Sequence, residues 1–256
     1  MKILLTNDDG IHSDGIKVLS GFLRKIANVY VVAPDTERSA VGVSLSLHKP
    51  LRLKEIEKNV FISDGTPVDC VDLGLAAVLK NHKPDLVVSG INSGPNIAED
   101  VFYSGTVGAI LEARMRNVSG LAVSMFSDAN NNFNYSAAAE TAVIVINQYF
   151  KKLKKNEIRT FNLNIPAVTD FSEIKGIKLT KLDRRTYPGG VITRKDPRGS
   201  EYYWIGGGKP DRKNIKDSDY NALSKKYASL TPLQLDITDY DFIKKNNKRS
   251  KLDVGF

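Results

Sequence analysis

The first 130 residues alternate between short apolar runs and segments with helical periodicity, and this alternation constrains the fold more than any other feature of the chain. The strand-like runs are residues 2–5, 29–33 (VYVVA), 85–89 (DLVVS) and 121–125, and the helix-like segments are 16–26, 67–81, 106–116 and 136–153. Strands that are apolar throughout and alternate with helices form βαβ units around a buried parallel sheet. The sequence therefore predicts an α/β fold with a mostly parallel sheet.

The composition of the chain changes near residue 154, where Pro, Gly, charged and aromatic residues become frequent and helical periodicity is lost. We divide the chain into a catalytic core at 1–154, a β-rich appendage at 155–240 and a basic tail at 241–256. The pattern leaves open whether some strands of the appendage return to the core.

Three segments of the appendage, TFNLNI, EYYWIGG and SLTPLQL, offer more apolar strand surface than a peripheral hairpin can bury by itself. Exposed apolar surface of this kind marks subunit interfaces. We expect a homo-oligomer, most simply a two-fold dimer, with Trp204 at the interface.

The net charge of +8 is unevenly distributed: residues 1–127 carry −1 and residues 128–256 carry +9, with five basic residues among the eight at 244–251. A basic region can bind nucleic acid or an anionic surface, but it can equally be a solvated tail, and we favour the tail. The single cysteine, Cys70, fits a reducing compartment. No apolar stretch approaches the ~18 residues of a membrane span. We expect a cytoplasmic protein.

Polar residues follow three of the predicted strands at the point where each strand ends. Asp8 and Asp9 follow the first strand, residues 34–39 (PDTERS) follow the second, and residues 90–96 (GINSGPN) follow DLVVS. The carboxyl ends of parallel strands lie on one edge of a sheet, where ligands bind. Carboxylate, hydroxyl and amide oxygens suit Mg²⁺, Mn²⁺ or Ca²⁺. Asp-Asp-Gly alone would predict only a turn, but three converging loops favour a metal site.

Ser104, Gly105 and Thr106 precede a predicted helix, whose first backbone N–H groups can bind an anion. Simple helix capping by Ser104 or Thr106 is the alternative, and both roles can coexist. Neither GxGxxG after the first strand nor GxxxxGK[ST] is present, which argues against a dinucleotide fingerprint and a P-loop.

These motifs together resemble the SurE survival protein family of metal-dependent nucleotidases. The matching segments are LLTNDDGI at 4–11, VVAPDTERSAVG at 31–42, SDGTPVDCV at 63–71, PDLVVSGINSGPN and YSGTVGAILEA within 84–113, DPRG at 196–199, YYW at 202–204 and SLTPLQLDIT at 229–238. The chain departs from the family pattern at Ser13-Asp14, where Ala-Pro is common, and at Ala98, where glycine is usual. Glycine-threonine and glycine-tyrosine pairs are also missing from KDSDYNALSKKYASLTPL.

The resemblance implies a Rossmann-like three-layer core, an appendage used for dimer or tetramer assembly, and hydrolysis of nucleoside 5′- or 3′-monophosphates, with short polyphosphate sometimes accepted. It also implies one divalent metal ion per subunit. The residues that match the metal ligands are Asp8, Asp9, Ser39 and Asn92, and those that match the phosphate-binding residues are Asn96, Ser104, Gly105 and Thr106.

The chemistry expected of such a site is metal-assisted hydrolysis of a phosphomonoester, in which a metal-bound water attacks phosphorus. Asp8 or Asp9 could also take the proton of that water, and the sequence does not separate the two roles. The rival hypotheses are a nucleotide-binding module without catalysis and a nucleic-acid-binding protein. The net charge of residues 1–127, which carry most of the motifs, is −1, and this argues against nucleic acid as a partner.

Overall fold

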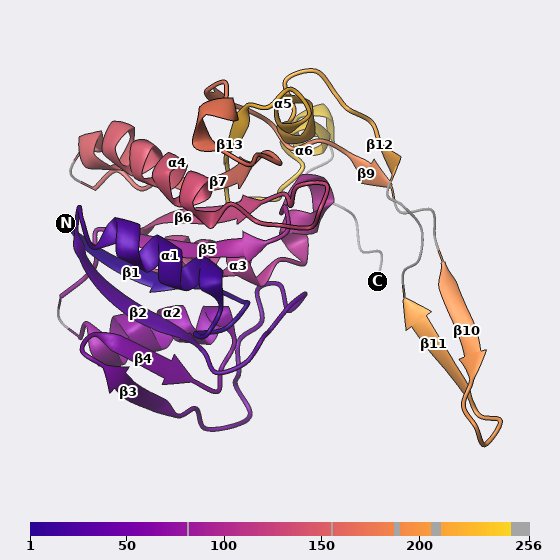
Figure 1. Cartoon of the computed structure of the whole chain (residues 1–256), viewed down its shortest axis with the longest axis horizontal. Coiled ribbons are helices and arrows are strands. Elements are labelled where there is room, and N and C mark those ends of the chain that lie inside the picture. The colour runs from indigo at the N-terminus through magenta and orange to yellow at the C-terminus, as the bar shows by residue number, and fades with distance from the viewer. Residues whose placement is uncertain (81, 155, 187–189, 206–210, 247–256) are drawn as a thin grey trace, which may run out of the picture.

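A nine-stranded sheet forms the centre of the protein (Figure 1). The structure is a computed structural model that describes residues 1–80, 82–154, 156–186, 190–205 and 211–246. The strands of the sheet, in spatial order, are β3 (Leu53–Glu57), β4 (Val60–Ser63), β2 (Asn28–Pro34), β1 (Lys2–Thr6), β5 (Leu86–Ser93), β6 (Ser119–Met125), β7 (Thr160–Ile165), β13 (Ala228–Pro232) and β8 (Ile177–Leu179). All neighbours are parallel except β3–β4 and β7–β13. The predicted α/β class with a mostly parallel sheet is confirmed.

Helices cover both faces of the sheet, so the core has three layers (Figure 1). Helices α1 (Asp14–Leu23) and α4 (Tyr135–Gln148) pack on one face, and α2 (Pro67–Leu73) and α3 (Gly105–Met115) on the other. Along β1, Ile3 and Leu5 face the first pair of helices, and Leu4 faces the second. Burying each of these side chains stabilises the fold by about 1.5–3 kcal/mol, which is why the strand is apolar on both faces.

The helix predicted from Pro67 to about residue 81 begins as expected but is shorter. Its start is a capping box, in which the Thr66 hydroxyl accepts the Asp69 N–H (3.1 Å) and the Asp69 carboxylate accepts the Thr66 N–H (2.8 Å). The α-helix ends at Leu73 and continues as a π-helical turn, η1 (Gly74–Val78). Residue 81 lies outside the described residues. Cys70, within this helix, is fully buried.

The β3–β4 hairpin was not predicted from the sequence. It forms one edge of the sheet, and β3 reads LKEIE with four of its five residues exposed. An edge strand with one partner needs no continuous apolar run, so the signal that identified the central strands is missing here.

Three strands of the predicted appendage return to the core. Strand β7 (TFNLNI) pairs with β6 and β13, and all six of its residues are buried. The expectation that TFNLNI supplies exposed interface surface is therefore wrong, because α4 and the neighbouring strands cover it. The SLTP part of SLTPLQL likewise lies in the main sheet, within β13.

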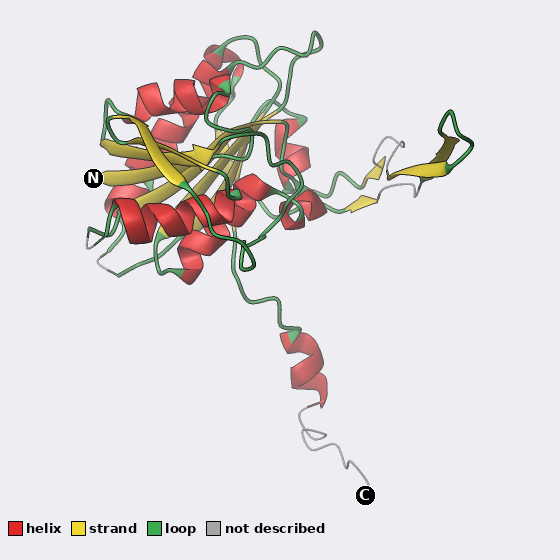
Figure 2. Ribbon diagram, turned by 90° about the horizontal axis from the view of Figure 1, so that it is seen from below, coloured by secondary structure: helices red, strands yellow, loops and turns green. Residues whose placement is uncertain are grey.

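The segments that project from the body are two short ribbons and the last helix (Figures 1 and 2). The ribbons pair β9 (Arg185–Thr186) with β12 (Asp211–Arg212), and β10 (Val191–Lys195) with β11 (Glu201–Ile205). Helix α5 (Asp219–Leu223) packs on the body, and α6 (Tyr240–Asn246) stands apart from it. The glycines at 206–208 and the tail at 247–256 lie outside the described residues. Among the helices that the structure describes, none is long and apolar enough to span a bilayer.

Candidate active site

Asp8 lies just beyond the carboxyl end of β1, at the point where the chain order of the strands reverses, with β2 on one side and β5 on the other. The Asp8 side chain is buried, and its Oδ1 accepts a hydrogen bond from the Thr106 hydroxyl at 2.5 Å. A Cβ on Gly105 would lie 3.0 Å from Asp8 Cβ, so a glycine is needed for α3 to approach this closely. The structure thus brings the predicted metal site and the predicted phosphate site into contact.

Asp9 is held by the end of β5. Its Oδ2 accepts hydrogen bonds from the Ser93 N–H (3.2 Å) and the Ser93 hydroxyl (3.0 Å), and Ser93 Oγ lies 2.8 Å from the Tyr135 hydroxyl at the start of α4. The sequence analysis missed Ser93 and Tyr135 as site residues. Ser93 lay within the GINSGPN loop that it identified, but nothing in the sequence connects Tyr135 with residue 9.

Asn92, the neighbour of Ser93, stands at an irregularity in the β5–β6 pairing. Its Nδ2 donates to the Gly94 carbonyl at 2.7 Å. That bond fixes the side-chain amide and leaves Oδ1, the oxygen a cation would bind, without a hydrogen bond from any residue in the described part of the chain. Asn92 therefore meets the requirements of a metal ligand.

Ser39 lies on the loop after β2, and this loop contacts the Asp8 backbone through a hydrogen bond from Arg38 N–H to the Asp8 carbonyl (2.7 Å). The Ser39 side chain is exposed, and its hydroxyl donates to Glu37 Oε1 at 2.5 Å. The three loops predicted to converge are thus connected by hydrogen bonds through Arg38 and Ser93. Glu37 was not among the predicted site residues. Its negative charge contributes to the raised pKa of Asp9.

Both aspartates are costly to ionise in this environment. Burial raises the pKa of Asp8 to about 6, with a further contribution from the Asp9 charge, and the Thr106 hydrogen bond opposes this rise. Burial also raises the pKa of Asp9, opposed by the bonds from Ser93 and reinforced by Glu37. Carboxylates that repel one another in a buried site are stabilised in the charged form by a cation.

The donor set fits a hard divalent ion better than zinc. The described residues contain no cluster of three or more His, Cys, Asp and Glu side chains suited to a metal. Two carboxylates with hydroxyl and amide oxygens, as Asp8, Asp9, Ser39 and Asn92 provide, leave positions for water and phosphate and favour Mg²⁺, Mn²⁺ or Ca²⁺.

The N-terminus of α3 supplies the anion-binding groups. Ser104 caps the helix by accepting the Val107 N–H at 3.1 Å, and both Ser104 and Thr106 are buried. The Thr106 hydroxyl donates to Asp8 and the Val107 N–H donates to Ser104, so the donors left for a phosphate among the described residues of this turn are the Gly105 N–H and the Ser104 hydroxyl. Capping and anion binding are therefore compatible here.

Asn96, predicted to face the phosphate, lies in a buried amide network. Its side chain donates to Ser124 Oγ (2.8 Å), its N–H donates to Asn164 Oδ1 (2.9 Å), and its carbonyl accepts from Asn162 (2.7 Å) and Asn164 (3.0 Å). No hydrogen bond joins Asn96 to Asp8 or Thr106 in the described part of the chain, so its contact with the phosphate stays a prediction. Asn96 ties the loop after β5 to β7, a strand whose alternating asparagines the sequence analysis left unexplained.

Two of the departures from the family pattern fall within this region. Ser13 Oγ accepts a hydrogen bond from Asn7 Nδ2 at 2.8 Å, which ties the start of α1 to the loop after β1. Ala98 has a left-handed backbone (φ 51°), the conformation that favours glycine.

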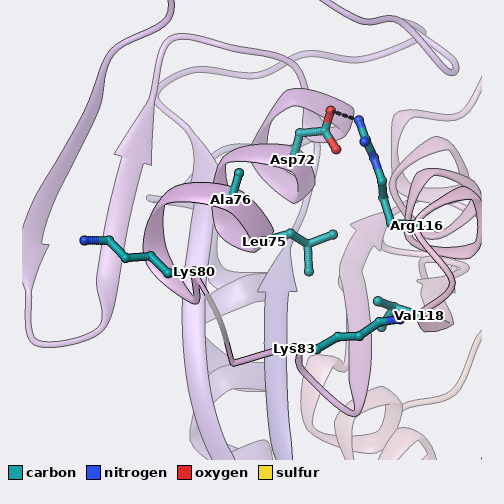
Figure 3. Close-up of a pocket in the computed structure, with 7 residues that line it drawn as sticks. All are labelled: Asp72, Leu75, Ala76, Lys80, Lys83, Arg116 and Val118. Carbon is teal, nitrogen blue, oxygen red and sulfur yellow. Dashed lines mark hydrogen bonds and ion pairs between the residues drawn. The ribbon is translucent and has the colours of Figure 1, made fainter.

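A cavity of about 450 Å³ lies near the starts of β5 and β6, at the edge of the sheet opposite the aspartates (Figure 3). Arg116 points to Asp72, with which it forms an ion pair at 2.7 Å, while Lys80 and Lys83 point in different directions. These cationic groups therefore do not converge as they would around a bound phosphate.

The fold and the site define a class: an α/β protein with paired carboxylates and a helix N-terminus at the carboxyl edge of its sheet. The family model described as survival protein SurE matches residues 3–189. The chain is 45% identical to 5′-nucleotidase SurE of Geotalea uraniireducens, over 94% of this chain and 96% of that protein. It is 44% identical to 5′-nucleotidase SurE of Geobacter sulfurreducens, over 94% and 90%.

The crystal structure of the SurE protein from Aquifex aeolicus is similar, with a TM-score of 0.83 and 37% identity over 97% of this chain and 99% of that one. This chain belongs to the SurE family.

Proposed function

We propose that this protein is a 5′-nucleotidase that uses a divalent metal ion to hydrolyse nucleoside 5′-monophosphates to nucleoside and phosphate. The relatives named 5′-nucleotidase SurE support the reaction class. Nucleoside 3′-monophosphates and short polyphosphate are further candidate substrates. The observation that carries the proposal is the contact between Asp8 and Thr106, because it places a carboxylate pair for a cation beside a helix N-terminus for a phosphate.

In this proposal Asp8, Asp9, Ser39 and Asn92 hold the metal ion. When bound, the ion would polarise a phosphoryl oxygen and lower the pKa of a coordinated water. The start of α3 orients the phosphate through the Gly105 N–H and the Ser104 hydroxyl and stabilises the charge that grows on the phosphate oxygens. Ser93 fixes Asp9 by two hydrogen bonds, and Thr106 fixes Asp8, so both carboxylates are oriented before substrate arrives.

Phosphate release from a panel of nucleoside monophosphates tests the proposal. The protein is stripped with a chelator and then supplied separately with Mg²⁺, Mn²⁺, Ca²⁺ and Zn²⁺. We expect turnover that depends on added metal and favours 5′-monophosphates. Binding of the nucleotides without phosphate release under every metal would instead identify a nucleotide-binding module.

We also propose that the protein assembles as a homodimer or homotetramer through the β10–β11 hairpin. Trp204 is 65% exposed and Ile205 is 93% exposed, and Tyr202 and Tyr203 are exposed beside them. An aromatic patch of this kind on a projecting hairpin is typical of an interface. For the compartment, the one cysteine supports a cytoplasmic location.

A further inference from the structure

Three side chains from separate elements form a chain of hydrogen bonds that leads from the start of α4 to the carboxylate pair. The Tyr135 hydroxyl lies 2.8 Å from Ser93 Oγ at the end of β5, and Ser93 Oγ lies 3.0 Å from Asp9 Oδ2 beyond β1. The proposed nucleotidase chemistry uses Asp9 and Ser93 but gives Tyr135 no task.

The direction of both hydrogen bonds follows from the protons available. An ionised Asp9 carboxylate can only accept, so the Ser93 hydroxyl donates its single proton to Asp9 Oδ2. Ser93 Oγ then offers only lone pairs, and the Tyr135 hydroxyl is the donor of the 2.8 Å bond. Successive hydrogen bonds of this kind polarise one another, so the bond from Tyr135 strengthens the bond from Ser93 to Asp9.

Tyr135 is anchored where it makes this contact. Its ring is half-buried against the main core and stacks on Phe133, with ring centroids 5.7 Å apart and an interplanar angle of 16°. The preceding residue, Asn134, caps α4 by accepting the Ala137 N–H at 3.1 Å and donates to the Thr169 carbonyl at 2.7 Å. A hydroxyl held this firmly can orient a neighbouring side chain at low entropic cost.

The two oxygens of Asp9 are not equivalent. Oδ2 accepts both the N–H of Ser93 (3.2 Å) and its hydroxyl (3.0 Å), whereas Oδ1 accepts no hydrogen bond from the residues that the structure describes. One oxygen is therefore fixed by the protein, and the other is open to a cation. Groups that orient a metal-binding side chain in this way typically contribute about 10- to 100-fold to metal affinity.

We propose that Tyr135 is a positioning residue of the metal site, which acts through Ser93 to hold Asp9 with its Oδ1 open to the cation. This proposal rests on the assignment of Asp9 to the metal ion in the proposed function. Among the described residues, the Tyr135 hydroxyl forms no hydrogen bond other than the one to Ser93. Its effect on metal binding therefore requires the Ser93 hydroxyl.

The test is a double-mutant cycle on the Kd for Mn²⁺, measured by isothermal titration calorimetry on chelator-stripped protein without nucleotide. We expect Tyr135→Phe to raise the Kd about 3- to 10-fold, as loss of one hydrogen bond predicts, and Ser93→Ala to raise it about 10- to 100-fold. In the Ser93→Ala background, Tyr135→Phe should change the Kd by less than about 2-fold, because the group through which it acts is gone.

Tyr149→Phe is the matched control. Tyr149 follows the last residue of α4 and is half-buried, and its hydroxyl forms no hydrogen bond with any residue in the described part of the chain. Removing this hydroxyl should leave the Kd for Mn²⁺ unchanged. A loss of affinity caused only by a disturbed α4 would appear in both tyrosine variants.

Two results overturn the positioning role. One is a Tyr135→Phe protein that binds Mn²⁺ as tightly as wild type, and the other is a loss of equal size with and without the Ser93 hydroxyl, which would mean that Tyr135 only packs at the start of α4. If wild type still binds Mn²⁺ and releases phosphate from nucleoside 5′-monophosphates, the nucleotidase assignment stands in either case. A wild-type protein that neither binds Mn²⁺ nor releases phosphate overturns both.

Discussion

Replacing Asp8 with asparagine should make the metal-free protein more resistant to unfolding at neutral pH while it destroys activity. Burial raises the pKa of Asp8 from its ordinary value of 3.8 to about 6. A raised carboxyl pKa means that the folded state disfavours the ionised form. The neutral Asp8 side chain therefore stabilises the fold below about pH 4, and this stability is lost as pH rises through about 6. The difference between the two pKa values corresponds to about 3 kcal/mol of free energy of unfolding. Asparagine has nearly the same shape and stays neutral throughout.

The assay is urea unfolding of wild type and Asp8→Asn in the presence of a chelator, at several pH values between 4 and 8. The free energy of unfolding of the variant, relative to wild type, should rise by about 2.4 kcal/mol between pH 4 and pH 8. Asp14→Asn is the control, because Asp14 is exposed at the start of α1. The free energy of unfolding of this variant, relative to wild type, should vary by less than about 0.5 kcal/mol over the same pH range.

Adding metal should reverse the ranking. An ion at a thousand times its dissociation constant stabilises a folded protein by about 4.1 kcal/mol, which exceeds the predicted difference of about 3 kcal/mol. Wild type should gain this amount, and Asp8→Asn should gain far less. Two results would refute the reasoning that Asp8 is a buried carboxylate that binds a cation. One is a stability difference between variant and wild type that does not change with pH, and the other is a variant that metal stabilises as much as it stabilises wild type.

Three other substitutions test separate parts of the account. Thr106→Val removes a hydrogen bond that lowers the Asp8 pKa, so the acid limb of the pH–activity profile should move to higher pH; an unchanged profile would mean that Thr106 only begins α3. Ala98→Gly should stabilise the protein by about 0.5 kcal/mol in thermal unfolding, whereas Ala109→Gly in α3 should destabilise it. Trp204→Ala should weaken assembly in light scattering, and a fully active wild-type monomer at micromolar concentration would contradict the interface.

The sequence predicted the central strands well because they are apolar on both faces, and it predicted the start of α2 because Thr66, Pro67 and Asp69 are a local capping signal. The β3–β4 hairpin escaped detection because an edge strand is only partly buried. The sequence left open whether strand β7 returns to the main sheet, because that return depends on a long-range pairing with β6, which no local pattern encodes.

In the candidate site too, some residues could be predicted from the sequence and others only from the structure. The meeting of Asp8 and Asp9 with the end of β5 could be predicted because the topology of a parallel sheet brings strand ends together, whereas Asn92 lies within β5 and was assigned through its family motif. The roles of Ser93 and Tyr135 depend on side-chain contacts between segments distant in sequence. Asn96 was assigned from its motif, yet its surroundings are set by β7, so only the structure could reveal the amide network that holds it.

The central claim is that Asp8 and Asp9 hold the metal ion that makes this protein a nucleotidase. The most direct measurement is phosphate release from adenosine 5′-monophosphate as Mg²⁺ or Mn²⁺ is titrated into chelator-stripped wild type and Asp9→Asn. Asp9→Asn removes one ligand charge at a loop position and should leave the fold intact by circular dichroism. We predict saturable, metal-dependent release by wild type and none above background by the variant. Release by Asp9→Asn at a near-normal rate, or wild-type release that persists without metal, would contradict the account.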